Sequence, residues 1–201
     1  MTPSIKPTHT SSVKSTPSVI LKRVGWGVML LLALLLFVVA SNYLTLDPEV
    51  YFPQQRAVYI AHTFGIISHI AGAMLATIIG PFQFLPALRR GSFLNVHRWL
   101  GRLYLGGVLV GGLSGLYMAF LAYGGLVAKL GFATLALLWL FSAVMAYQHI
   151  RHKEIQQHKE WMIRNYALTF GAVTLRLWLG VFQVVGLEFL TSYMIVAWLA
   201  W

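Results

Sequence analysis

The chain has 201 residues, of which 58% are hydrophobic and only 10% are charged. Soluble globular domains carry roughly 25% charged residues, so this composition excludes a water-soluble fold and indicates a membrane protein. Cysteine is absent, which excludes disulfides, iron–sulfur clusters and thiol nucleophiles. The formal net charge is +10, but Lys and Arg lie in short clusters beside apolar runs, a pattern that indicates membrane topology and not nucleic-acid binding.

The N-terminal segment is polar and the segment after it is apolar. Residues 1–17 are rich in Ser, Thr, Pro and Lys and cannot bury enough apolar surface to fold. Residues 24–43 are almost wholly apolar and have the length of a transmembrane helix, which needs about 20 residues. We therefore predict a disordered basic cytoplasmic tail over 1–23 and a transmembrane bundle over 24–201. A cleavable signal peptide is the alternative, but the long polar lead favours a retained anchor.

Four further apolar segments are long enough to cross a bilayer, and they are predicted as helices over 58–85, 96–123, 126–149 and 161–185. Pro81 is expected to kink the first of these near its end. The last apolar run, 187–201, reaches only about 22 Å at 1.5 Å per residue, so it is re-entrant or the chain is truncated. The predicted fold class is an all-α polytopic transmembrane bundle of five full spans plus a short sixth apolar helix.

Lys and Arg are distributed unequally between the two sides of this bundle. One side has Arg56 and Lys129, with Arg176 inside a helix. The other has twelve of the 15 basic residues: Lys6, Lys14, Lys22, Arg23, Arg89, Arg90, Arg98, Arg102, Arg151, Lys153, Lys159 and Arg164. Because cytoplasmic loops carry the excess of Lys and Arg, we predict a bacterial inner-membrane protein whose N-terminus faces the cytoplasm.

Two predicted helices carry polar residues on one face, and such faces usually point into the bundle. In the second helix the spacing of seven aligns His62, His69 and Gln83. In the fifth helix the shared face holds Asn165, Thr169, Arg176 and Gln183.

Arg176 falls in the outer half of the bilayer, where an unpaired charge costs several kcal/mol, so it needs a partner. That partner is either a carboxylate, from Asp47, Glu49 or Glu188, in a structural ion pair, or an anionic or redox-active group. In the third predicted helix, Gly107, Gly111 and Gly115 form a smooth strip against which another helix can pack closely. As a contact surface this strip would serve a homo-oligomer or another membrane protein.

Three histidines gather at the predicted cytoplasmic boundary, namely His97, His149 and His158. Histidine is a common ligand of haem iron and other metals, so His97 and His158, at equal depth on two helices, are candidates to hold one haem b. His149 is a candidate to join them in a metal site. The alternative is that all three are interfacial residues that orient the protein or contact lipid head groups. No other helix offers an outer histidine to pair with His62 or His69, which disfavours a second haem.

Two sequence blocks, HRWLGRLY from His97 and HKEWMIRNYALTFGAVTLRLW from His158, resemble an uncharacterised family of bacterial membrane proteins, the domain of unknown function 2306. The resemblance covers roughly the second to the sixth helix and implies the same multi-helix architecture, with no established activity. The signature positions it implies are His97, Arg98, Gly101, Arg102, His158, Trp161, Arg164 and Arg176. A looser likeness to two-haem cytochrome b proteins places His97 and His158 at the ligand positions of one haem.

No nucleophile-and-base set, phosphate-binding glycine loop or zinc protease motif occurs in the membrane segments, so a hydrolase is disfavoured; whether the protein is an enzyme stays open. The first hypothesis is a membrane protein of unassigned activity whose interior polar site comprises His62, His69, Arg98, Arg102, Arg164, Asn165 and Arg176. The second is a b-type haem electron carrier that uses His97 and His158. The third is a proton or ion pathway lined by His62, His69 and Arg176.

Overall fold

The computed structural model of the chain describes residues 16–201, and within this range all regular structure is helical. The helices are α1 (Thr16–Ser41), α2 (Arg56–Ala61), α3 (Thr63–Gln83), α4 (Leu94–Ala119), α5 (Gly125–Arg151), α6 (Ile155–Val184) and α7 (Phe189–Leu199). Short 3-10 turns connect α1 to α2 and α3 to α4. The prediction of an all-α membrane bundle is confirmed.

Most of the predicted tail lies outside the described residues. Its last part does not, because α1 already begins at Thr16, so residues 16–23 are helical and not part of a tail. Pro17 explains the early start, since proline lacks an N–H and is well suited to the first turn of a helix.

Among residues 16–201, four helices are long and apolar enough to cross a membrane: α1 from Ile20, α3, α5 and α6. Helix α4 also has 26 residues, but Arg98 and Arg102 confine its apolar part to the turns that follow them. Helix α7 has only 11 residues. These are the five long helices and the short apolar helix that the sequence predicted.

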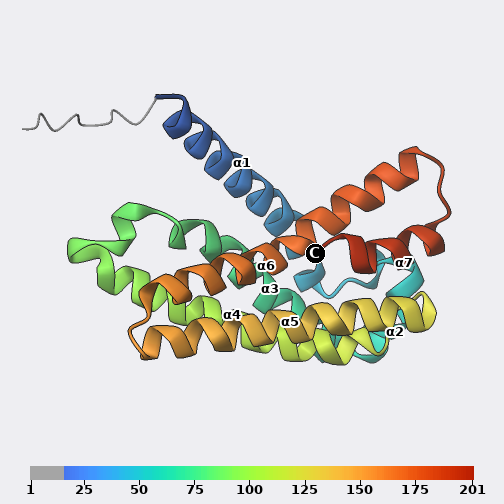
Figure 1. Cartoon of the computed structure of the whole chain (residues 1–201). Helices are drawn as coiled ribbons and strands as arrows, with labels where there is room; N and C mark the ends of the chain where they lie inside the picture. Colours follow the sequence, from blue (N-terminus) through green and yellow to red (C-terminus); the bar gives the residue numbers. More distant parts are fainter. Residues whose placement is uncertain (1–15) are drawn as a thin grey trace, which may run out of the picture.

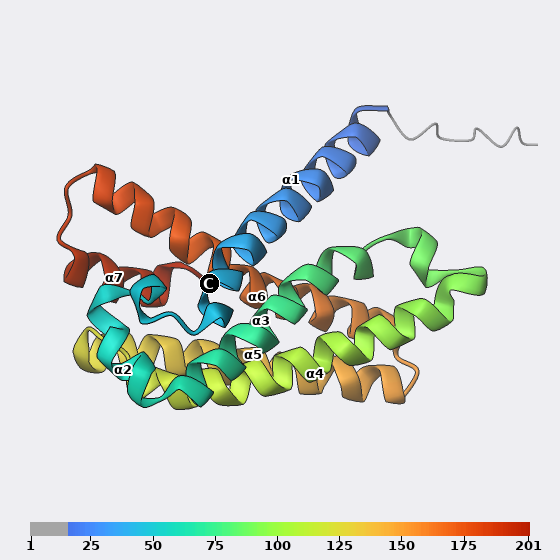
Figure 2. The ribbon, with the colours of Figure 1, turned by 180° about the vertical axis from the view of Figure 1, so that it is seen from behind.

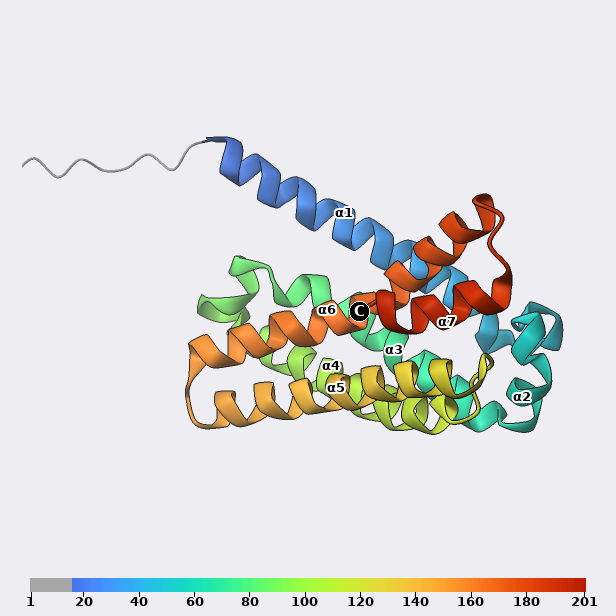
Figure 3. The same ribbon diagram turned by 45° about the vertical axis from the view of Figure 1, so that its right-hand side comes forward.

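The chain runs back and forth between two ends of the bundle. Figure 1 shows the start of α1, the α3–α4 connection and the α5–α6 turn on one side, which we call the inner end. Helix α2, the α4–α5 turn and the α6–α7 turn lie on the opposite side, the outer end, and the view from behind in Figure 2 shows the same grouping. Helix α7 turns back from the outer end and stops beside the middle of α6 (Figure 3), where Thr174 donates to the carbonyl of Ala200. The short last helix therefore packs back against α5 and α6.

The glycine strip of α4 packs inside the chain, against α3. A Cβ added to Gly72 of α3 would lie 2.5 Å from the backbone nitrogen of Gly111 and 2.6 Å from the carbonyl oxygen of Gly107. The two helices thus touch backbone to backbone, as small residues permit in membranes. The prediction of close packing is confirmed, but Gly107 and Gly111 are covered by α3 and are not free to form a contact between copies or with another protein.

The second predicted helix is interrupted at His62, which has φ −124° and ψ 39° and separates α2 from α3. The continuous helix predicted over 58–85 was wrong at this point. Two side chains stabilise the break: Nδ1 of His62 lies 2.8 Å from the hydroxyl of Tyr117, and the hydroxyl of Thr63 donates to the carbonyl of Ile60 at 2.9 Å.

Pro81 lies within α3, which continues to Gln83. A proline in a helix leaves the carbonyl four residues earlier without its N–H partner. That carbonyl belongs to Thr77, and the hydroxyl of Tyr166 on α6 donates to it at 3.2 Å. Gly80 makes room for this contact, since a Cβ there would lie 1.9 Å from the Tyr166 ring. The Gly80–Pro81 pair is thus a docking point for α6.

Candidate functional site

A cavity of about 310 Å³ lies within the bundle, bounded by residues of α1, α3, α4, α5, α6 and α7. Most of its wall is apolar, including Leu36 and Phe37 of α1, Ile66 of α3 and Leu179 of α6. Few polar side chains reach it, and they are Tyr43, Gln55, Tyr59, His69, Thr77, Trp139, Thr169, Arg176 and Tyr193. An apolar cavity with a few convergent polar groups is the usual form of a small-molecule site, and such sites measure roughly 300–1,000 Å³.

Arg176 is the charged residue of the cavity wall. It lies about 12 Å from the outer end of α6 at 1.5 Å per residue, and it lines the cavity while remaining exposed at the surface of the structure. Its Nη1 donates to the carbonyl of Ala172, one turn earlier on the same helix, at 2.9 Å. A guanidinium has five N–H donors, and the contact with Ala172 uses one of them, so the others are available to a group in the cavity.

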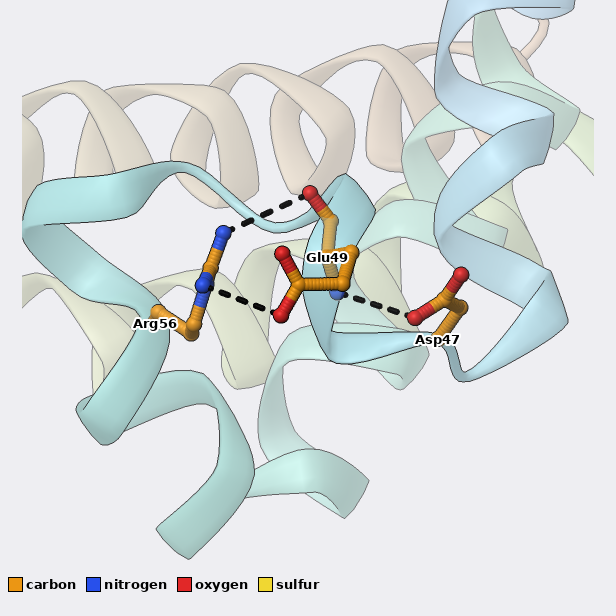
Figure 4. A network of polar contacts seen from close by, with 3 residues as sticks. All are labelled: Asp47, Glu49 and Arg56. Atoms are coloured by element: carbon orange, nitrogen blue, oxygen red, sulfur yellow. Dashed lines mark hydrogen bonds and ion pairs between the residues drawn. The ribbon is translucent and has the colours of Figure 1, made fainter.

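The chain has five acidic side chains, all within the described residues, and none forms an ion pair with Arg176. Glu49 accepts from Arg56 at 3.2 Å, and Asp47 accepts from the backbone N–H of Glu49 at 2.9 Å, as Figure 4 shows. Glu188 directly precedes α7.

The other two acidic residues lie at the inner end. Glu154 pairs with His149, and Glu160 lies 4.0 Å from Arg164. The predicted ion pair between Arg176 and Asp47, Glu49 or Glu188 was therefore wrong: Asp47 and Glu49 have local partners, and Glu188 forms no ion pair among the described residues.

Three tyrosines surround the outer side of Arg176: Tyr43, Tyr59 and Tyr193. The Tyr43 and Tyr59 rings meet edge to face with centroids 6.3 Å apart. Burial raises the pKa of Tyr59 above its ordinary value, so this hydroxyl is uncharged at neutral pH and does not neutralise Arg176. The tyrosines supply neutral hydrogen-bonding groups beside an uncompensated cation.

His69 lies on the α3 wall of the same cavity. Its Nδ1 is 2.8 Å from the carbonyl oxygen of Gly111. A carbonyl oxygen only accepts hydrogen bonds, so Nδ1 carries the hydrogen and Nε2 of the neutral ring carries a lone pair. Gly115 makes room for the ring, since a Cβ there would lie 2.6 Å from Nδ1. Gly115, the last glycine of the strip, thus leaves space for the His69 ring.

Asn165 joins three helices beside the cavity. It accepts from the hydroxyl of Tyr104 on α4 at 2.7 Å and donates to the Trp139 carbonyl and the Ser142 hydroxyl on α5 at 2.8 and 2.7 Å. Trp139 in turn donates to the hydroxyl of Thr169 at 2.8 Å. Asn165 is fully buried and all its polar atoms are paired. Its interior position was predicted, and its contacts serve to hold α4, α5 and α6 together.

The remaining predicted site residues do not line the cavity. His62 faces Tyr117 near the outer end, so of the three residues proposed for an ion pathway only His69 and Arg176 share the cavity. Arg102 and Arg164 lie over the rings of Trp99 and Trp161, with the guanidinium carbon 4.8 and 5.0 Å from the ring centres. Arg98 is exposed on α4.

The inner histidines take different partners. Nδ1 of His158 lies 2.8 Å from the carbonyl of Ala146 on α5, and His97 lies near His158 with its own Nδ1 buried and unpaired. His149 pairs with Glu154. Across residues 16–201 no three His, Asp or Glu side chains are grouped as a metal site would require, so the arrangement expected for His97, His149 and His158 together is not formed.

Sequence reasoning did not identify the tyrosine cluster or Gln55 as part of a site. Tyr43 and Gln55 come from 3-10 turns, Tyr59 from α2 and Tyr193 from α7, so no helical period links them. The only available signal was the high density of tyrosine between the first two long helices.

No curated protein and no solved structure matches the chain. The family of predicted membrane proteins DUF2306 matches residues 66–201, which include all of α4, α5, α6 and α7 and most of α3. The matched range contains His69 and Arg176. The chain therefore belongs to the DUF2306 family of predicted membrane proteins.

Proposed function

We propose that this protein binds an anionic amphiphile within the membrane, with the anionic head beside Arg176 and the apolar part against the walls of the cavity. The observation that carries the proposal is that none of the five acidic side chains, all of which belong to the described residues, forms an ion pair with Arg176.

Electrostatics favours a ligand over an empty cavity. A cation in an apolar environment is costly unless it is paired, and a guanidinium binds carboxylate or phosphate oxygens through two parallel hydrogen bonds. The tyrosine hydroxyls beside Arg176 can add further hydrogen bonds to the same head. The surrounding Leu, Ile and Phe side chains favour an apolar tail, which selects amphiphiles over small inorganic anions.

Binding of dodecanoate to the purified protein in nanodiscs of neutral lipid tests this proposal. The wild type should bind dodecanoate more tightly than dodecyltrimethylammonium, and Arg176→Gln should weaken dodecanoate binding about tenfold or more, as expected for the loss of a charged hydrogen-bonding partner. Arg164→Gln is the control, since Arg164 is exposed at the inner end. Equal binding by wild type and Arg176→Gln would refute the proposal.

For the membrane orientation we propose that the inner end faces the cytoplasm of a bacterial inner membrane. The support is the gathering of Lys and Arg around the start of α1, the α3–α4 connection and the α5–α6 turn. A reporter that is active only in the cytoplasm should be active when it is fused at residue 91 or at residue 153. The same reporter should be inactive when it is fused at residue 124. The reverse pattern would overturn the assignment.

A second candidate function is a single haem held between His97 and His158. It is favoured by the contact of His158 Nδ1 with the Ala146 carbonyl, because metal-ligating histidines usually donate their other ring N–H in this way. Protein expressed with added haem should then show a Soret band that is lost in His158→Ala and kept in His149→Ala. Haem-free protein under those conditions would exclude this candidate.

A further inference from the structure

We propose that the head group bound beside Arg176 is a singly protonated phosphate monoester, whose hydroxyl donates to Nε2 of His69. This inference rests on the proposed function and names the ligand class of the same site. It is carried by two groups that line the same cavity and have opposite hydrogen-bonding character, a donor-only guanidinium on α6 and a histidine on α3 whose tautomer is fixed by the backbone.

The tautomer follows from geometry. Because Nδ1 of His69 is 2.8 Å from the Gly111 carbonyl oxygen, Nδ1 is the donor and Nε2 is an acceptor. No hydrogen bond to Nε2 is formed by any residue in the described part of the chain. Protonating the ring would place a second unpaired cation in the same apolar cavity as Arg176, which electrostatics opposes. Besides its hydroxyl and amide groups, the cavity therefore presents one cationic donor, Arg176, and one neutral ring acceptor, Nε2 of His69.

This pair of groups discriminates among anionic heads. A carboxylate and a sulfate monoester offer only acceptor oxygens, so they satisfy Arg176 and leave Nε2 of His69 unpaired. A phosphate monoester with one proton offers anionic oxygens to Arg176 and one P–OH donor to His69. Its single negative charge also matches the single positive charge of Arg176, whereas a doubly ionised phosphate would leave a net charge in the cavity.

The α4 glycines support this role for His69. Gly111 supplies the carbonyl that fixes the ring, and Gly115 leaves the space that the ring occupies, since a Cβ there would lie 2.6 Å from Nδ1. The packing that holds α3 against α4 thus also orients Nε2.

The test compares dodecyl phosphate with dodecyl sulfate at about pH 5, below the second phosphate pKa of about 6, where both share a chain length and a predominantly single negative charge. Wild-type protein in nanodiscs should prefer dodecyl phosphate about tenfold, the effect of one hydrogen bond to a charged group. His69→Asn should lose the preference, because Asn can still donate to Gly111 but has no acceptor at the position of Nε2. His69→Gln places an amide oxygen near that position and should keep part of the preference.

The hydrogen bond between the P–OH group and His69 can also be tested by changing the ligand instead of His69. The methyl ester of dodecyl phosphate keeps one negative charge but lacks the P–OH group, so it should bind to the wild type like dodecyl sulfate. Equal affinities for dodecyl phosphate, its methyl ester and dodecyl sulfate, all lost in Arg176→Gln, would overturn the assignment to His69 and leave the proposed function intact. Failure of all three to bind would refute both.

Discussion

The contact between α3 and α4 predicts a large effect of a single methyl group at Gly72. The added Cβ would lie 2.5 Å from the Gly111 nitrogen, and ordinary contact begins at 3.4 Å, so the two helices must separate by about 0.9 Å. A gap of that size forfeits roughly a quarter to a half of the dispersion energy between facing atoms. Relief through a flexible side chain is not available, because the atoms in contact are backbone. Gly72→Ala should therefore destabilise the protein by about 3 kcal/mol.

Gly106→Ala is the matched control, since a Cβ on Gly106 meets nothing within 4 Å. It replaces glycine by alanine in α4 itself and should leave stability unchanged or raise it by up to about 1 kcal/mol through helix propensity. Unfolding in detergent can be followed by the fluorescence of the seven tryptophans, because the chain has no cysteine for thiol-reactive dyes. If Gly72→Ala melts at the wild-type temperature, α3 and α4 do not pack as described.

Three further outcomes are expected in the same melting assay. Asn165→Ala should lower the free energy of unfolding by about 2 kcal/mol, because three hydrogen bonds between helices are lost and each contributes roughly 0.6 kcal/mol in membrane proteins. An unchanged melting temperature would contradict this prediction. Tyr166→Phe should lower the free energy of unfolding by about 1 kcal/mol. The Thr77 carbonyl, which has no N–H partner because of Pro81, would then lose its hydroxyl donor as well. Arg56→Gln should cost less than about 1 kcal/mol, because the side chain of its partner Glu49 is 77% exposed.

The number and order of the long helices could be predicted from the sequence, because the thickness of the hydrocarbon core of a bilayer sets the length of each apolar run. Runs of about 20 apolar residues have few alternatives in a bilayer, and all five appear as long helices. The division at His62 could not be predicted, because it depends on a hydrogen bond with Tyr117 on another helix. The start of α1 at Thr16 was not predicted, because the polar composition of residues 1–17 indicated disorder although Pro17 suits the first turn of a helix.

For the candidate site, helical periodicity selected Arg176 and His69, which line the cavity, and Asn165, which is buried, but it did not identify their partners. A period places residues on a face and says nothing about what that face meets. Asp47 and Glu49 were expected near Arg176 from depth alone, whereas the turns between α1 and α2 satisfy these carboxylates locally. The tyrosines beside Arg176 converge from separate turns and helices, and only the three-dimensional structure brings them together.

If Arg176 is a ligand-binding residue, then a carboxylate supplied by the protein should replace the ligand. Ala172 lines the cavity one turn before Arg176, and Glu four residues before Arg is the favourable orientation for an ion pair on a helix. Ala172→Glu should therefore abolish binding of the anionic amphiphile. Ala172→Gln has nearly the same shape and no charge, so it controls for lost space in the cavity.

Because Ala172→Glu and Ala172→Gln differ in charge and have nearly the same shape, comparing their melting temperatures isolates the effect of charge. Ala172→Glu should melt at or above the temperature of Ala172→Gln when no ligand is present, because an internal ion pair then replaces an unpaired cation. With ligand, only Ala172→Gln should be stabilised. If both variants bind dodecanoate equally, the charge of Arg176 does not select the ligand, since a competing carboxylate one turn away would otherwise have displaced it.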